Sequence, residues 1–177
     1  NENYGNAIDL KGLILADSGQ PSAARKFLLE ADERLENTRP GSANQELFGA
    51  YLRGVLAMLC GDVDEVPLLL ADWPDLVPNF GMAALLLAAA DDLADRSLSC
   101  SRRLSELASE WSGEPDYHFM LACHHLAHRE YNDVAGVLSR WPQSEDGLDD
   151  WRRVYLECCL SLCQGRVPIL PARIAFI

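Results

Sequence analysis

The feature that most constrains this chain is a short sequence that occurs twice, 68 residues apart. Residues 70–74 read LADWP, and residues 138–142 read LSRWP. The stretch that leads into the second copy has the apolar spacing of two short helices, residues 117–128 and 132–141. Since 68 is twice 34, the chain is expected to repeat a pair of antiparallel helices about every 34 residues.

The same helical spacing of apolar residues recurs along the rest of the chain, between breaks made by glycine, proline and polar residues. We therefore expect an all-α fold of about nine helices. Besides the two above, the predicted helices cover residues 7–18, 21–35 with Pro21 in the first turn, 44–60, part of 62–73, 79–91, 95–111 and 148–164.

Local signals predict how the fourth helix begins. Gly61 suits a left-handed cap at the end of the third helix. Asp62 and Glu65 have the spacing of a capping box for the fourth helix. Pro67 lies deep for a first-turn proline, so this helix is expected to start late or to bend.

Composition narrows the classes of partner. The 177 residues carry a net charge of −12, which argues against nucleic-acid binding because phosphate contacts require Lys and Arg. No apolar run is long enough to predict a membrane span.

The six cysteines fall inside helical patterns, so reduced thiols and a cytoplasmic location are expected. Because the chain begins with Asn1, we expect it to be a piece of a longer protein.

Small residues at particular helix positions carry a resemblance to a known family. Gly12, Gly19, Ala24 and Ala31 fit its first unit; further matching positions are Gly54, Gly61, Leu87, Ala88, Leu104, Ala122, Tyr131 and Leu138. Over residues 4–142 the chain is similar to the tetratricopeptide-repeat (TPR) family. The resemblance implies a right-handed TPR-like α-solenoid of stacked antiparallel helix pairs in a single domain, 1–177. Its units would be residues 4–37, 44–74, 79–112 and 115–142, with a partial or capping unit at 148–177.

The resemblance also implies a binding groove. In that family, set positions of each first helix line the concave side of the stack, and here they hold mostly apolar and aromatic residues. The groove residues expected by this resemblance are Leu13, Phe48, Tyr51, Val55, Met58, Met82, Leu85, Phe119, Cys123 and Leu126. A groove of this kind suits a hydrophobic or amphipathic peptide segment of a partner. The alternative is that these side chains are buried in the core.

The predicted function is therefore a non-enzymatic protein–protein interaction module. A weaker resemblance, in size, acidity and apolar groove, links the chain to the small acidic TPR chaperones of type III secretion, which implies a secretion chaperone. One alternative is a regulatory or sensor docking domain of a larger multidomain protein. Self-association is a further alternative for the partner.

Histidines crowd one predicted helix. His118, His124, His125 and His128 lie with Cys123 between residues 117 and 128, and two of the histidines are four residues apart. Zinc requires a third and usually a fourth ligand, yet no CxxC or HExxH pattern is present. We predict a partly exposed cluster near a helix C-terminus, with a metal-binding protein built on residues 118–128 as the less favoured alternative.

Catalytic signatures are missing from the sequence. It contains no Gly-x-Ser-x-Gly elbow and no phosphate-binding glycine loop, so no enzyme, cofactor or bound metal is predicted. For the last helix, the predicted inner face consists of Trp151, Tyr155, Leu156, Cys159 and Leu162.

Overall fold

The computed structural model describes residues 8, 11–12, 14–16, 18–35, 43–73, 77, 80–142, 149–166, 168 and 174–175. These residues form helices and turns, together with one pair of two-residue strands. The predicted all-α class is confirmed. The helices are α2 (Pro21–Leu35), α3 (Ala43–Cys60), α4 (Glu65–Leu69), α5 (Gly81–Leu93), α6 (Ser97–Trp111), α7 (Pro115–Ala127), α8 (Tyr131–Ser139) and α9 (Trp151–Cys163). None of these described helices is both long and apolar enough to cross a lipid bilayer.

The start of α4 differs from its prediction. Gly61 has φ +86° after the end of α3, as expected of a left-handed cap. The capping box is wrong, because Asp64 occupies the N-cap position and makes no side-chain cap bond. Asp62 and Glu65 instead accept hydrogen bonds from the guanidinium of Arg25 in α2. A late start is confirmed, since α4 begins only two residues before its proline.

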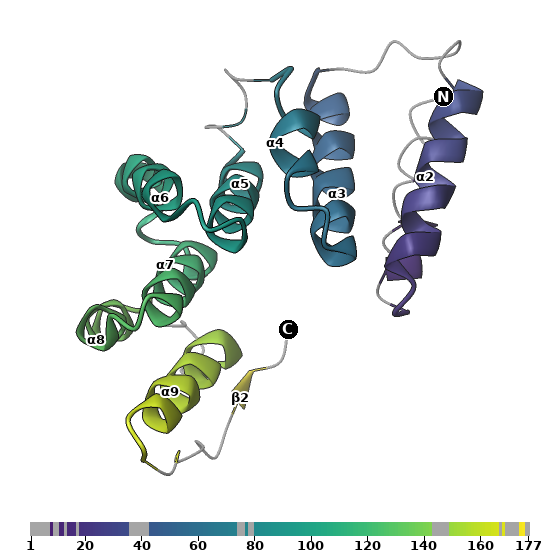
Figure 1. Cartoon of the computed structure of the whole chain (residues 1–177). Coiled ribbons are helices and arrows are strands. Elements are labelled where there is room, and N and C mark those ends of the chain that lie inside the picture. Colours follow the sequence, from purple (N-terminus) through teal and green to yellow (C-terminus); the bar gives the residue numbers. More distant parts are fainter. Residues whose placement is uncertain are drawn as a thin grey trace. The chain divides into compact units, whose positions relative to one another are not determined.

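The chain divides into two compact units, residues 1–103 and 104–177, and the boundary falls inside α6. In the first unit α3 contacts α2, α4 and α5, and α4 contacts α5. In the second unit α7, α8 and α9 all contact one another (Figure 1). Each unit therefore holds one set of three mutually contacting helices, which we call the α3–α4–α5 trio and the α7–α8–α9 trio.

The two trios match one another at the 68-residue spacing seen in the sequence. Val66 in α4 and Val134 in α8 are both fully buried. Gly61 and Arg129, which precede these helices, both have a positive φ, +86° and +61°. The repeat therefore extends beyond the LADWP and LSRWP segments to the turn and the buried face of the second helix.

The repeated segments themselves have the same backbone hydrogen bond. The N–H group of Trp73 donates to the carbonyl of Leu70 at 3.3 Å, and that of Trp141 donates to Leu138 at 3.3 Å. The first bond lies beyond the end of α4, whereas the second starts inside α8, at Leu138, and ends beyond it. The two copies thus share this turn, although α8 extends two residues farther than α4.

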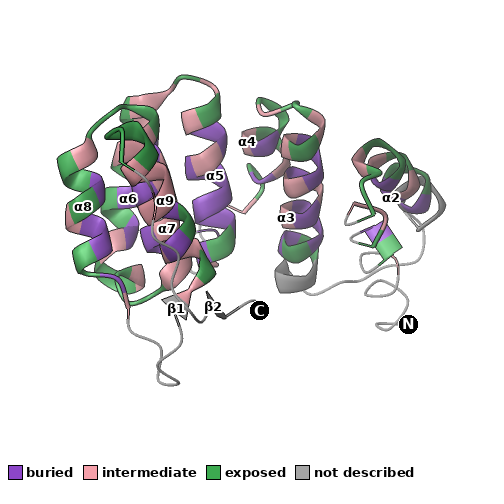
Figure 2. Cartoon of the chain, turned by 90° about the horizontal axis from the view of Figure 1, so that it is seen from below, coloured by how far each residue is buried: buried purple, intermediate pink, exposed green. Residues whose placement is uncertain are grey.

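Glycine allows two helices to approach closely in the first unit. A Cβ atom added at Gly54 of α3 would lie 2.8 Å from Cδ2 of Leu86 in α5. α5 is buried along most of its length (Figure 2). Its close approach to α3 therefore depends on the missing side chain.

An ion-pair network around the buried carboxylate of Asp91 closes the turn between α5 and α6. The carboxylate of Asp91 accepts hydrogen bonds from Nε of Arg96 and Nε of Arg103, both at 2.8 Å. Arg96 also donates to Asp64 at 2.7 Å. Burial would raise the pKa of Asp91, but the bonds from Arg103 and Arg96 outweigh burial and hold this pKa below its usual value.

The second unit contains the only strands among the described residues. β1 (Asp149–Asp150) and β2 (Ile174–Ala175) pair in parallel, with Asp149 opposite Ile174. β2 also contacts α9. Asp150 is the N-cap of α9, and its side chain accepts a hydrogen bond from the backbone N–H of Arg152 at 2.9 Å.

Candidate binding surfaces

Aromatic side chains gather between α3 and the start of α5 in the first unit. The ring of Phe80 lies 5.3 Å from the ring of Tyr51 and 6.4 Å from that of Phe48, measured between centroids. Phe48 is 43% exposed, and the other two are half-buried. We call Phe48, Tyr51 and Phe80 the α3–α5 surface. Met82, which follows two residues later, is 38% exposed.

A second aromatic group lies between α7 and α9 in the second unit. The ring of Phe119 is 6.0 Å from the ring of Trp151 and 6.3 Å from that of Tyr155. Trp151 is 38% exposed and Tyr155 is 54% exposed. We call these three residues the α7–α9 surface. Each unit therefore presents aromatic side chains contributed by two chain segments.

The 68-residue repeat relates the two surfaces, but the residues at two matching positions differ in type and in exposure. Tyr51 and Phe119 occupy matching positions, 68 residues apart, and both touch other aromatic rings. The positions in α5 that match Trp151 and Tyr155 hold Ala83 and Leu87, which are 0% and 7% exposed. Positions that belong to the core in the first unit therefore carry exposed aromatic rings in the second.

This finding corrects the predicted inner face of the last helix. Of its five residues only Leu156 is buried, and the other buried residue of α9 is Val154. Tyr155 and Leu162 are mostly exposed. Apolar residues occur around most of α9, so their spacing did not distinguish the side that contacts α7 and α8.

Cationic side chains next to the α7–α9 surface are held in ion pairs. Arg152 donates to Asp150 at 2.9 Å and also to Asp116. Arg153 donates to Glu157 at 2.9 Å. Burial would raise the pKa of Asp150, but the bonds from Arg152 outweigh it and keep this pKa below its usual value. Nearby positive charge is thus neutralised within the chain.

The ten predicted groove residues have different environments. Leu13 lies outside the residues whose side chains are described. Leu85 is buried, because α5 is enclosed on most of its circumference, and so it cannot contact a partner in this structure. Phe48 and Met82 are exposed. The half-buried ones are Tyr51, Val55, Met58, Phe119, Cys123 and Leu126.

The half-buried residues of α7 could belong either to a groove or to the core. Phe119, Cys123 and Leu126 also pack against the core of the second unit. That core consists of Ala122, Val134, Val137, Leu138, Trp141 and Leu156. The three residues therefore contribute to the core through one part of the side chain and remain partly accessible.

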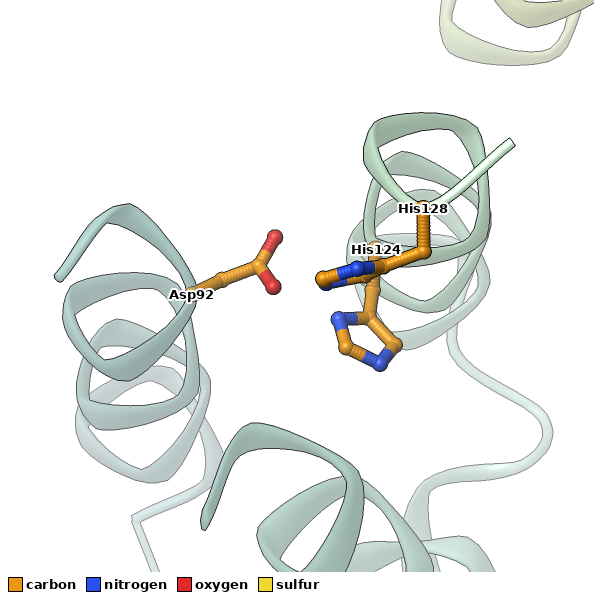
Figure 3. Close-up of side chains that lie close together, drawn as sticks. All are labelled: Asp92, His124 and His128. Atoms are coloured by element: carbon orange, nitrogen blue, oxygen red, sulfur yellow. The ribbon is translucent and has the colours of Figure 1, made fainter. Parts of the chain in front are cut away.

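The histidines do not form one exposed cluster. His118 is buried, and its Nε2–H donates to the carbonyl of Ser112 at 2.8 Å. His124 is buried too, whereas His128 is exposed, and their ring centroids are 4.6 Å apart on α7 (Figure 3). Asp92, drawn in the same figure, belongs to α5 of the first unit.

His125 has a different set of neighbours. Its Nδ1 lies 2.6 Å from Oε2 of Glu130, at the turn between α7 and α8. One ligand atom each from His125, Glu130 and Asp133 lie within 4.8 Å of one another. The hydrogen bond with His125 holds the pKa of Glu130 below its usual value. These are residue types that could hold a metal ion.

All six cysteines belong to the described part of the chain, and each is a free thiol. Cys100 in α6 is fully buried, and burial raises the pKa of its thiol to about 12. Cys163, at the end of α9, is exposed. The thiolate is the reactive form, so Cys100 is inert in the folded chain.

No protein-family model, curated protein or solved structure matches this chain. Its TPR-like family and its function therefore stay predictions that rest on the chain's own residues.

Proposed function

We propose that this chain is a non-enzymatic binding module that holds an apolar or amphipathic segment of another polypeptide. The observation that carries the proposal is the exposure of Trp151 and Tyr155 at positions whose counterparts in α5 are buried. Such residues have large apolar rings and a polar atom that tolerates water, which suits a surface that is covered only when a partner binds.

The proposed arrangement is a TPR-like solenoid of stacked antiparallel helix pairs. Support comes from Gly54, where α3 and α5 approach closely, and from the positive φ of Gly19 and Gly61 between predicted paired helices. The occurrence of one similar trio in each unit also supports a repeat. Stacked helix pairs would give the partner an extended surface rather than a closed pocket.

The number of aromatic side chains that a partner can cover sets an upper limit on its affinity. Full burial of one large apolar side chain contributes about 1.5–3 kcal/mol. Covering the exposed parts of the α7–α9 surface would thus contribute a few kcal/mol, of which ordering the partner removes a share. We therefore expect a dissociation constant of about 1 mM or weaker for one such surface alone, since about 4 kcal/mol corresponds to 1 mM.

Charge favours a basic partner. The chain has a net charge of −12, and Arg152 and Arg153, next to the α7–α9 surface, are paired with carboxylates. A segment with lysines beside its apolar residues would be attracted by the remaining negative charge. A second copy of this chain would be repelled by the same charge.

The test uses a fluorescein-labelled amphipathic peptide of leucine and lysine, with a scrambled peptide of equal composition as control. Fluorescence anisotropy should show binding of the amphipathic peptide only. Tyr155→Glu should weaken it about tenfold, because each 1.4 kcal/mol corresponds to a factor of ten. Phe48→Glu tests the α3–α5 surface in the same way. Leu98→Glu changes a leucine of α6 that is 89% exposed and belongs to neither surface, and should leave binding unchanged.

Two outcomes would contradict the proposal. One is equal binding of the amphipathic and scrambled peptides. The other is an equal loss of affinity in Leu98→Glu and Tyr155→Glu, which would mean that added charge alone weakens binding. Circular dichroism of each variant checks that its helices remain folded.

A further inference from the structure

The turn between α7 and α8 brings together an imidazole and two carboxylates. Nδ1 of His125 lies 2.6 Å from Oε2 of Glu130, and a carboxylate oxygen of Asp133 completes a group within 4.8 Å. Arg129 has φ +61°, and the backbone N–H of Glu130 donates to the carbonyl of His125 at 2.9 Å. The backbone of the turn therefore places the three residues next to one another.

The first unit shows what two carboxylates at this position do. Asp62 and Glu65 match Glu130 and Asp133 at the 68-residue spacing, and both accept hydrogen bonds from the guanidinium of Arg25. In the first copy, this pair of carboxylates therefore forms surface ion pairs with an arginine of the same chain.

The arginine is not repeated at the equivalent position. Arg25 is the fifth residue of α2, and the fifth residue of α6, the 15-residue helix that precedes α7 as α2 precedes α3, is the uncharged Ser101. In the second copy the imidazole of His125 faces Glu130. Three of the chain's four histidines lie at this end of α7.

The ligand set indicates the chemical class of the cation. An imidazole nitrogen and carboxylate oxygens are ligands of zinc and of other divalent first-row metals. A metal–ligand distance of about 2.0–2.2 Å places ligands farther apart than a hydrogen bond does, so Glu130 must move slightly away from His125. Glu130 and Asp133 are exposed, so their side chains are accessible for this change.

We propose that His125, Glu130 and Asp133 form a binding site for one divalent transition-metal ion, with Zn²⁺ as the ion used to test it. Water molecules would complete the coordination, because three protein ligands leave at least one position of a tetrahedral ion open. The site is independent of the aromatic surfaces, so its failure would leave the proposed peptide binding unaffected.

The competing explanation is a simple ion pair between His125 and Glu130. Isothermal titration calorimetry of the full chain with Zn²⁺ distinguishes the two. The metal site predicts that one equivalent of Zn²⁺ binds at this turn. It also predicts that Asp133→Asn lowers the Zn²⁺ affinity at least about tenfold, since loss of a ligand or of its support costs about 10–100-fold. The ion pair predicts no such dependence, because Asp133 takes no part in it.

Glu157→Gln is the matched control. Glu157 is a half-buried carboxylate of the same unit, paired with Arg153 in α9, and its loss changes the net charge equally. Zinc affinity should remain unchanged in this variant. Equal losses in Glu157→Gln and Asp133→Asn would overturn the proposal, since they would reflect net charge.

Exposed thiols are the other source of zinc binding. Co²⁺ reports on this, because thiolate ligands give intense near-ultraviolet bands that nitrogen and oxygen ligands lack. The proposed site predicts Co²⁺ binding without those bands, and unchanged binding in Cys163→Ser. Nuclear magnetic resonance of the histidine rings should show that Zn²⁺ shifts Nδ1 of His125. Unperturbed His125 signals at saturating Zn²⁺ would refute the assignment.

Discussion

The α3–α4–α5 trio and the α7–α8–α9 trio have the same contacts between helices but bury their third helices differently. α5 is buried at nine of its 13 residues, and α9 at two of 13. Ala83 and Leu87 in the core of the first unit are replaced by the exposed rings of Trp151 and Tyr155. A repeat unit can therefore keep its internal packing while its outer face changes from core to accessible surface.

The same comparison applies to the ionic groups. The two carboxylates that follow the first helix of each trio pair with Arg25 in one copy; in the other, Glu130 pairs with His125 and Asp133 lies within 4.8 Å. Asp91 of α5, which two arginines bind, corresponds to Cys159 of α9. Carboxylates that pair with arginines in the first unit thus have other neighbours, or are replaced by another residue, in the second unit.

The largest expected contrast is between Leu87 and Tyr155. Leu87→Ala should lower the free energy of unfolding by about 2–5 kcal/mol, since it removes a buried side chain. Tyr155→Ala should lower it by less than about 1 kcal/mol, because the ring is mostly exposed. Urea unfolding followed by circular dichroism measures both. Equal losses would show that α9 is enclosed as tightly as α5 and would remove the contrast.

A smaller effect is expected at Asp91. Asp91→Asn should cost about 2 kcal/mol at neutral pH, because hydrogen bonds to charged groups contribute about 1.5–3 kcal/mol. The pKa of Asp91 lies below its usual value of 3.8, so its contribution is complete above pH 3.8 and is lost as the pH falls through the lowered pKa. Stability curves measured from neutral to acidic pH should therefore converge for wild type and Asp91→Asn. If the two curves stay parallel down to acidic pH, the ionised carboxylate of Asp91 does not stabilise the fold.

The smallest effect concerns the turns before α4 and α8. Arg129 has φ +61°, a conformation that costs a non-glycine residue about 1 kcal/mol. Arg129→Gly should raise the free energy of unfolding by a few tenths to about 1 kcal/mol, since glycine also loses more chain entropy on folding. Gly61→Arg should lower it by about 1 kcal/mol. Thermal unfolding of the two variants checks the opposite signs; shifts in the same direction would show that the turns are not equivalent.

The helices could be predicted from the sequence because their apolar spacing is local. α3 begins one residue before its predicted start, and α2 begins at Pro21, the residue predicted for its first turn. The wrong capping box shows where local signals fail. Asp62 and Glu65 had the right spacing, but Arg25, 37 residues earlier, binds both.

The candidate surfaces could be predicted only in part. Tyr51 and Phe119 were expected on a groove and are half-buried beside other rings. Trp151 and Tyr155 were expected inside, because periodicity marks apolar residues but does not show which of them have neighbours. Their exposure depends on contacts between helices that the spacing of one helix does not contain.

The contact pattern of the described helices has a consequence for folding speed. Every pair of these elements with substantial contact lies next to one another in the chain or one element apart. The loops that must close during folding are therefore short, and the entropy lost before contacts form is small. Contacts between elements that are close in sequence favour fast folding, so each trio should form quickly after dilution from denaturant.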